Sequence, residues 1–238
     1  MTKTPANNKK LPSYAQRVLS QVDEFELTTR AVVTTTLARG KKARAHDWLR
    51  RLTDVGKLFR HEHADGDRRF VYYARHDRPI VLRHLRRAFA TLWLCRICTP
   101  HLKLLTEDEL LRLAGVLLDA AVPELPKHVR CVLYPVQGES VPRIALLRIH
   151  GQSDPDRVNL NRAVTDIDRI VSLPAFRLWH RLALLQRFAF VYLIAGEENA
   201  AELGRWLQRR PPVSRVATTA VTIDVHVRPA EPLHYGYA

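Results

Sequence analysis

Residues 28–73 constrain the fold most strongly, because two helical patterns and one hairpin pattern follow one another there without a long gap. Helices are expected over residues 28–38 and 42–55, separated by a short basic turn. In the second, apolar residues recur every three or four positions, as in a helix with one buried face. This face comprises Ala45, Leu49, Leu52 and Val55, and Trp48 widens it.

The opposite face of this expected helix is strongly polar. It carries Lys42, Arg44, His46, Asp47, Arg50 and Arg51. Gly56 follows the last turn, where a residue in the left-handed region commonly ends a helix. We therefore expect a helix that is buried on one side and charged on the other.

A β-hairpin is expected directly after that helix. Residues 59–63 and 68–73 are β-rich runs, and they flank the Ala-Asp-Gly-Asp sequence of residues 64–67. An Asp-Gly pair between two such runs is a strong hairpin signal. Before the pair of helices, residues 13–24 have a helical pattern with Tyr14, Val18, Leu19 and Val22 facing inward. Pro12 suits the start of this helix, and threonines 28 and 29 suit the cap of the next.

Three helices followed by a basic hairpin resemble a winged helix-turn-helix domain, and the resemblance covers residues 12–76. It implies that the helix over residues 42–55 enters a DNA groove. The residues near the start of this helix would meet base edges. They are Lys42, Ala43, Arg44 and His46, followed by Asp47 and Arg50. Arg39, Lys41 and Arg51 would contact phosphates, and Arg68 and Arg69 of the hairpin would reach the backbone or the minor groove.

The distribution of charge agrees with a partner that is a polyanion. The chain has a formal net charge of +14, and residues 1–100 contribute 21 basic and 9 acidic residues to it. The remaining residues contribute 17 basic and 15 acidic ones. A basic half joined to a nearly neutral half is typical of a nucleic-acid-binding module attached to another domain.

The rest of the chain predicts a helical connector and an α/β domain. Residues 77–80 mark a break, and helices follow over residues 81–97 and 105–121. The first of these has a stripe formed by Val81, Leu85, Ala88, Phe89, Leu92 and Trp93. It can connect the halves, pack on the first domain or pair with a second copy; we favour a connector that adds to a dimer contact.

In the α/β domain we expect adjacent antiparallel strands at 129–136 and 142–150, and helices at 160–171 and 176–185. A continuously apolar strand at 188–194 is expected to be buried on both faces. A helix at 196–209 and strands at 213–217 and 220–227 complete the pattern. The predicted fold is thus an α+β winged helix-turn-helix domain followed by an α/β domain. Its divisions are a disordered basic tail (1–11), the winged domain (12–76), the connector (77–124), the α/β domain (125–230) and a tail (231–238).

The second half, preceded by a winged helix, resembles the plasmid replication-relaxation family in architecture, most visibly over residues 188–210. That resemblance implies a degenerate PD-(D/E)XK nuclease-like domain. An active nuclease of this type needs acids on adjacent strands to hold a metal. The run over residues 143–150 has no acid and carries Arg143 and Arg148 instead. Glu139, Asp154, Asp156, Asp166 and Asp168 have the spacing of solvated loop and helix charges, so we do not expect an enzyme.

Three cysteines do not make an even disulfide framework, which favours a reducing cytoplasm. Cys95, Cys98, His101 and Cys131 are a weak set of zinc ligands, and buried thiols are the better interpretation. For His61 and His63, on alternate strand positions, a DNA-facing or solvent-facing place is favoured over metal ligation. The sequence has no P-loop, dinucleotide-binding turn or nucleophile elbow, and we expect no cofactor.

The sequence therefore predicts a non-enzymatic, cytoplasmic and nucleoid-associated protein that binds double-stranded DNA, with some influence of DNA sequence. Its expected role is control of replication, maintenance or transcription of bacterial DNA, such as a plasmid or mobile element. We expect a homodimer, a possible protein partner for the second domain, and no association with a membrane. The alternatives are a winged-helix adaptor that binds protein and a metal-dependent nuclease with displaced acids.

Overall fold

The chain folds as a mixture of α-helices and β-sheets that divides into two compact units, one ending at Ile80 and the next beginning at Val81. The computed structural model describes residues 12–65, 68–100, 102–120, 130–135, 141–150, 177–195, 201–202, 205 and 217–223. The expected tails at 1–11 and 231–238 and the expected helix at 160–171 lie outside the described residues, as does nearly all of the one at 196–209.

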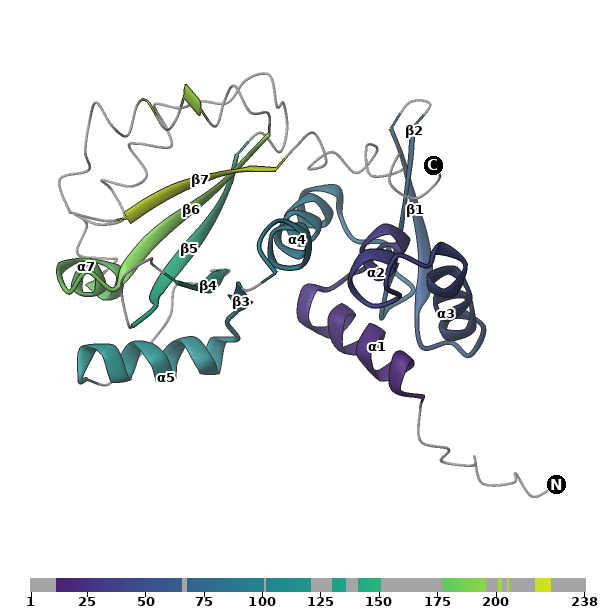
Figure 1. Cartoon of the computed structure of the whole chain (residues 1–238), viewed down its shortest axis with the longest axis horizontal. Coiled ribbons are helices and arrows are strands. Elements are labelled where there is room, and N and C mark those ends of the chain that lie inside the picture. The colour runs from purple at the N-terminus through teal and green to yellow at the C-terminus, as the bar shows by residue number, and fades with distance from the viewer. Residues whose placement is uncertain are drawn as a thin grey trace. The chain divides into compact units, whose positions relative to one another are not determined.

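The first unit contains three helices and a hairpin (Figure 1). The helices are α1 (Ser13–Phe25), α2 (Arg30–Thr36) and α3 (Lys42–Asp54). Strands β1 (Phe59–Asp65) and β2 (Arg68–Ala74) pair antiparallel, with Phe59 opposite Ala74 and Asp65 opposite Arg68. The predicted helices and hairpin of this region are confirmed, within two residues at most boundaries.

One core holds these elements together. Val18 and Val22 of α1, Val33 of α2, and Leu49 and Leu52 of α3 meet in a single buried cluster. Val55 was expected to extend this buried face and does not, because α3 ends at Asp54 and Val55 is 63% exposed at the C-cap. Gly56 adopts φ +66°, which confirms the predicted left-handed residue after the helix.

The start of α2 differs from the prediction and adds a strand contact. Thr28 was assigned to the helix, but its N–H and carbonyl both bond to the backbone of Tyr73 in β2, with N···O distances of 2.9 Å. The buried Gln21 amide donates to the Thr28 hydroxyl at 2.7 Å. Thr29 then caps α2, accepting from the N–H of Val32 at 3.2 Å, as predicted. The hairpin is thus tied to the segment between α1 and α2.

The second unit begins with α4 (Leu82–Trp93), which continues into a π-helical turn, Leu94–Cys98. The expected helix at 81–97 is therefore present, although its last turn is wider than α-helical. Val81 was expected on the apolar stripe, but it precedes the helix as its N-cap and is 70% exposed. The remaining stripe residues are buried, namely Leu85, Ala88, Phe89, Leu92 and Trp93.

A five-stranded sheet forms the centre of the second unit, in the order β3-β4-β5-β6-β7. The strands are β3 (Lys103–Leu104), β4 (Cys131–Tyr134), β5 (Arg143–His150), β6 (Phe188–Ala195) and β7 (Ala217–Ile223). Pairs β3–β4 and β4–β5 are antiparallel, and β5–β6 and β6–β7 are parallel. The antiparallel pair is confirmed. The predicted gap between strands 213–217 and 220–227 is wrong, because β7 runs through residues 218–219. Strand β3 was not predicted from the sequence.

The central strand β6 confirms the strongest prediction for this unit, since every residue from Phe188 to Leu193 is at most 1% exposed. Helices α5 (Glu107–Leu118) and α7 (Arg177–Leu184) lie on one side of the sheet (Figure 1). Their inner residues share a core with alternate positions of β5 and β6. This core includes Leu110, Ala114, Ile144, Trp179, Leu182, Phe188 and Phe190.

The start of α5 provides a test of local stability, since Thr106 and Glu109 form a capping box. The Thr106 hydroxyl accepts from the Glu109 N–H at 3.2 Å, and a Glu109 carboxylate oxygen accepts from the Thr106 N–H at 3.1 Å. We expect Thr106→Ala to lower the free energy of unfolding by about 1 kcal/mol, measured by urea denaturation. Thr106→Ser keeps the acceptor oxygen and is the control. Equal stability of both variants would contradict this role.

Candidate nucleic-acid interface

Helix α3 separates its apolar and charged residues as the sequence predicts. Ala45, Leu49 and Leu52 are at most 2% exposed and face the core of the first unit. Of the predicted contact residues of α3 and of the turn before it, Asp47 is half-buried and the other eight are exposed. They are Arg39, Lys41, Lys42, Ala43, Arg44, His46, Arg50 and Arg51. The fold therefore brings these eight residues onto one helix and its leading turn.

The turn between α2 and α3 fixes where the charged helix begins. Arg39 and Gly40 adopt φ +54° and +77°, and the Gly40 N–H donates to the Thr34 carbonyl at 2.8 Å. Lys41 then occupies the N-cap of α3, and its side chain makes no capping hydrogen bond. The first turn of α3 holds no acid. The amino end of a helix carries a partial positive charge, so Lys42 and Arg44 add to a favourable field for an anion.

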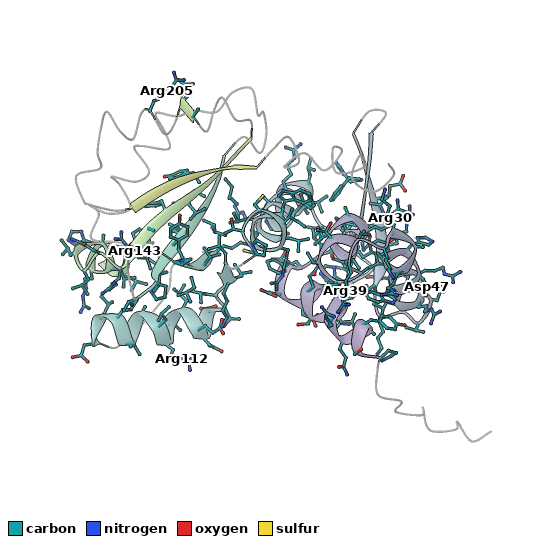
Figure 2. All side chains as sticks on the ribbon, in the orientation of Figure 1. Arg30, Arg39, Asp47, Arg112, Arg143 and Arg205 are labelled. Carbon is teal, nitrogen blue, oxygen red and sulfur yellow. The ribbon has the colours of Figure 1, made fainter. Side chains whose placement is uncertain are left out.

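Asp47 occupies the middle of the outward face and pairs with two of the predicted contact residues. Its Oδ1 accepts from Arg50 Nη2 at 3.2 Å, and its Oδ2 accepts from Arg51 Nε at 2.9 Å. Figure 2 shows Asp47 on the outer side of α3. Desolvation raises the pKa of the Asp47 carboxyl, but the hydrogen bonds from Arg51 and Arg50 outweigh it, so this pKa is lower than usual. The carboxylate remains ionised at neutral pH.

Arg51 lies at the flank of α3 that faces α1. The Asp47 carboxylate, and after it the Tyr14 hydroxyl, raise the pKa of Arg51. Tyr14 of α1 stacks on Trp48 of α3, with ring centroids 5.0 Å apart and 14° between the ring planes. Sequence reasoning missed this cluster, although the spacing of Asp47, Arg50 and Arg51 by three and four positions is a readable signal for ion pairs on a helix.

In the hairpin, one prediction is wrong and two are not tested by the described residues. The side chains of Arg68 and Arg69 lie outside what the structure describes, as does the turn at residues 66–67, so their predicted contacts stay predictions. His61 was expected to face DNA or solvent, and this is wrong. It is 8% exposed, its Nε2 lies 2.8 Å from the His76 carbonyl oxygen, and its ring stacks on its cross-strand partner Tyr72. The histidine is part of the base of the hairpin.

Of the residues outside the hairpin that were weighed for metal or nuclease chemistry, the structure describes the three cysteines and the two arginines of β5. Cys95 and Cys131 are buried and Cys98 is exposed, and burial raises the pKa of the Cys131 thiol. Across the described ranges, no three His, Cys, Asp or Glu side chains gather as a metal site would require. On β5, Arg143 is buried and Arg148 half-buried. His101, Glu139, Asp154, Asp156, Asp166 and Asp168 lie outside the described residues.

Comparison of the chain with protein-family models, with curated proteins and with solved structures found no match. None of the helices that the structure describes has the length and apolar character needed to cross a lipid bilayer.

Proposed function

We propose that residues 12–76 form a winged helix-turn-helix domain that binds double-stranded DNA with α3 in the major groove. The observation that carries this proposal is the two-sided character of α3. Ala45, Leu49 and Leu52 anchor its apolar face in the core, while the basic side chains on its opposite face are exposed. A rigidly held helix that offers cations to solvent fits a groove about 12 Å wide whose edges carry base acceptors.

The order of elements supports the same interpretation. Three helices are followed by an antiparallel hairpin, and Thr28 pairs with Tyr73 so that the hairpin is fixed to the helices. In this arrangement, Lys42, Arg44 and Arg50 donate to guanine O6 and N7, and Ala43 packs on a thymine methyl group. Arg39, Lys41 and Arg51 bind phosphates and set the orientation of the domain without reading sequence.

We propose further that the protein controls replication, maintenance or transcription of bacterial DNA, with the second unit used for dimerisation or for a protein partner. A two-fold dimer doubles the DNA contacts without any new chemistry. The basic first hundred residues and the nearly neutral remainder support this division of roles.

The salt dependence of binding tests the proposed function. With fluorescently labelled random duplex, we expect binding that weakens with a log–log slope of about −5 if six phosphates are neutralised. Between about 50 and 200 mM salt this slope corresponds to a loss of roughly 10³-fold in affinity. Fluorescence anisotropy of the full-length protein measures it. Absence of binding at the lower salt concentration would overturn the proposal and favour a protein-binding adaptor.

A further inference from the structure

Asp47 lies where a DNA-binding helix is expected to meet the bases, although its negative charge is unfavourable next to DNA. With 100° of rotation per residue, Ala43, Asp47, Arg50 and Asp54 lie on the side of α3 opposite the buried Ala45 and Leu49. The Asp47 side chain is 36% exposed. A carboxylate at this position repels phosphates, so it opposes binding that relies on the DNA backbone alone.

The geometry of the two ion pairs shows what the carboxylate does to its neighbours. Each oxygen serves one guanidinium: Oδ1 holds Arg50 through Nη2, and Oδ2 holds Arg51 through Nε. Arg50 remains 62% exposed. Since Asp47 contacts only one edge of that guanidinium, Arg50 keeps further N–H groups for guanine O6 and N7. A guanidinium that is already oriented loses less rotamer entropy when it binds.

Resting on the proposed function, we infer that Asp47 is a specificity-determining residue. It orients Arg50 toward guanine and penalises duplexes that offer only phosphates at that position. Arg50 and Asp47 therefore read one G·C base pair together, and Arg51, held on the Tyr14 flank, stays with the backbone.

The inference predicts opposite changes in two measured affinities of Asp47→Asn. Selection from a random duplex pool gives the preferred site of the wild type, and anisotropy gives its affinity relative to random duplex. In Asp47→Asn, we expect affinity for random duplex to rise about threefold to tenfold, as one repulsive charge is removed. The ratio of specific to random affinity is expected to fall at least tenfold, the equivalent of about 1.4 kcal/mol.

Asp54→Asn is the matched control, because Asp54 is an exposed acid on the same helix and its loss changes the net charge equally. We expect this variant to bind random duplex more tightly and to keep the specificity ratio. Arg50→Ala is expected to lose preference for the same base pair as Asp47→Asn, and the double variant to lose no more than either single one. Thermal unfolding of each variant confirms that the fold is retained.

Three results would overturn the inference while leaving the proposed function intact. They are an unchanged specificity ratio in Asp47→Asn, a fall of the same size in Asp54→Asn, and a wild type that binds duplex without selecting any site. A wild type that binds no duplex at all would instead overturn the proposed function, and the inference with it.

Discussion

Replacing Lys42, Arg44 and Arg50 together by alanine is expected to weaken binding to duplex DNA by about 10³-fold, which abolishes a gel shift at micromolar protein. All three side chains are exposed on α3, and each is assigned a contact to the DNA. A contact worth about 1.4 kcal/mol contributes a factor of ten, and good base contacts contribute about 1–3 kcal/mol. Alanine favours helices, so α3 should remain folded in this variant.

The matched control removes the same charge from the other unit. Arg112, Arg181 and Arg205 are exposed residues of the second unit, and Figure 2 labels Arg112 and Arg205. We expect alanine at these three positions to change affinity by less than about threefold, since none of them is assigned a contact to the DNA and a charge without such a contact is screened by salt. Losses of equal size in both triple variants would show that net charge, and not α3, holds the DNA.

Local patterns in the first unit were sufficient to predict its elements from the sequence. The spacing of Ala45, Leu49 and Leu52 specifies both the existence of α3 and its buried side, because only one face of that helix can leave water. Gly56 specifies its end, since the backbone there requires a positive φ that glycine adopts without strain. The exposure of the basic side chains follows from the same periodicity.

What the sequence did not predict depends on partners distant in the chain. Thr28 has the properties of a helix-capping residue, and only the structure shows that it forms an isolated β-bridge with Tyr73 instead. His61 is polar and lies on a basic strand, and its burial follows from the Tyr72 ring opposite and the His76 carbonyl. The Thr28 contact joins segments far apart in the chain, and the His61 contacts depend on which residues of the hairpin and of the segment after it lie beside the ring.

In the candidate site, too, the sequence predicts one property of α3 and misses another. The list of exposed basic residues is readable from periodicity, but their electrostatic state is not. Arg50 and Arg51 were assigned as cations available to DNA, and both share the Asp47 carboxylate. Exposed ion pairs of this kind are weak, so a phosphate or a guanine edge can compete with Asp47 for the two guanidinium groups. The two ion pairs therefore orient the guanidinium groups of Arg50 and Arg51 but leave both groups able to bind DNA.

Two leucine-to-alanine substitutions in α7 are expected to differ strongly in their effect on the stability of the second unit, because one leucine is buried and the other is exposed. Leu182 is fully buried in the core with Trp179 and Phe188, whereas Leu184, two residues on, is 68% exposed. Leu182→Ala removes buried methyl groups and leaves a cavity, which costs about 2–5 kcal/mol. Leu184→Ala removes the same atoms from solvent and is expected to change stability by less than about 0.5 kcal/mol.

Hydrogen–deuterium exchange of the amides of β6 measures this difference where it arises, because strand β6 packs on the same core. A loss of about 3 kcal/mol corresponds to exchange faster by roughly a hundredfold for amides that open with the unit. We expect this acceleration in Leu182→Ala and not in Leu184→Ala. Equal exchange in the two variants would contradict the packing of α7 on the sheet. If exchange is faster in Leu182→Ala, as expected, the affinity of this variant for random duplex shows whether the second unit contributes to DNA binding.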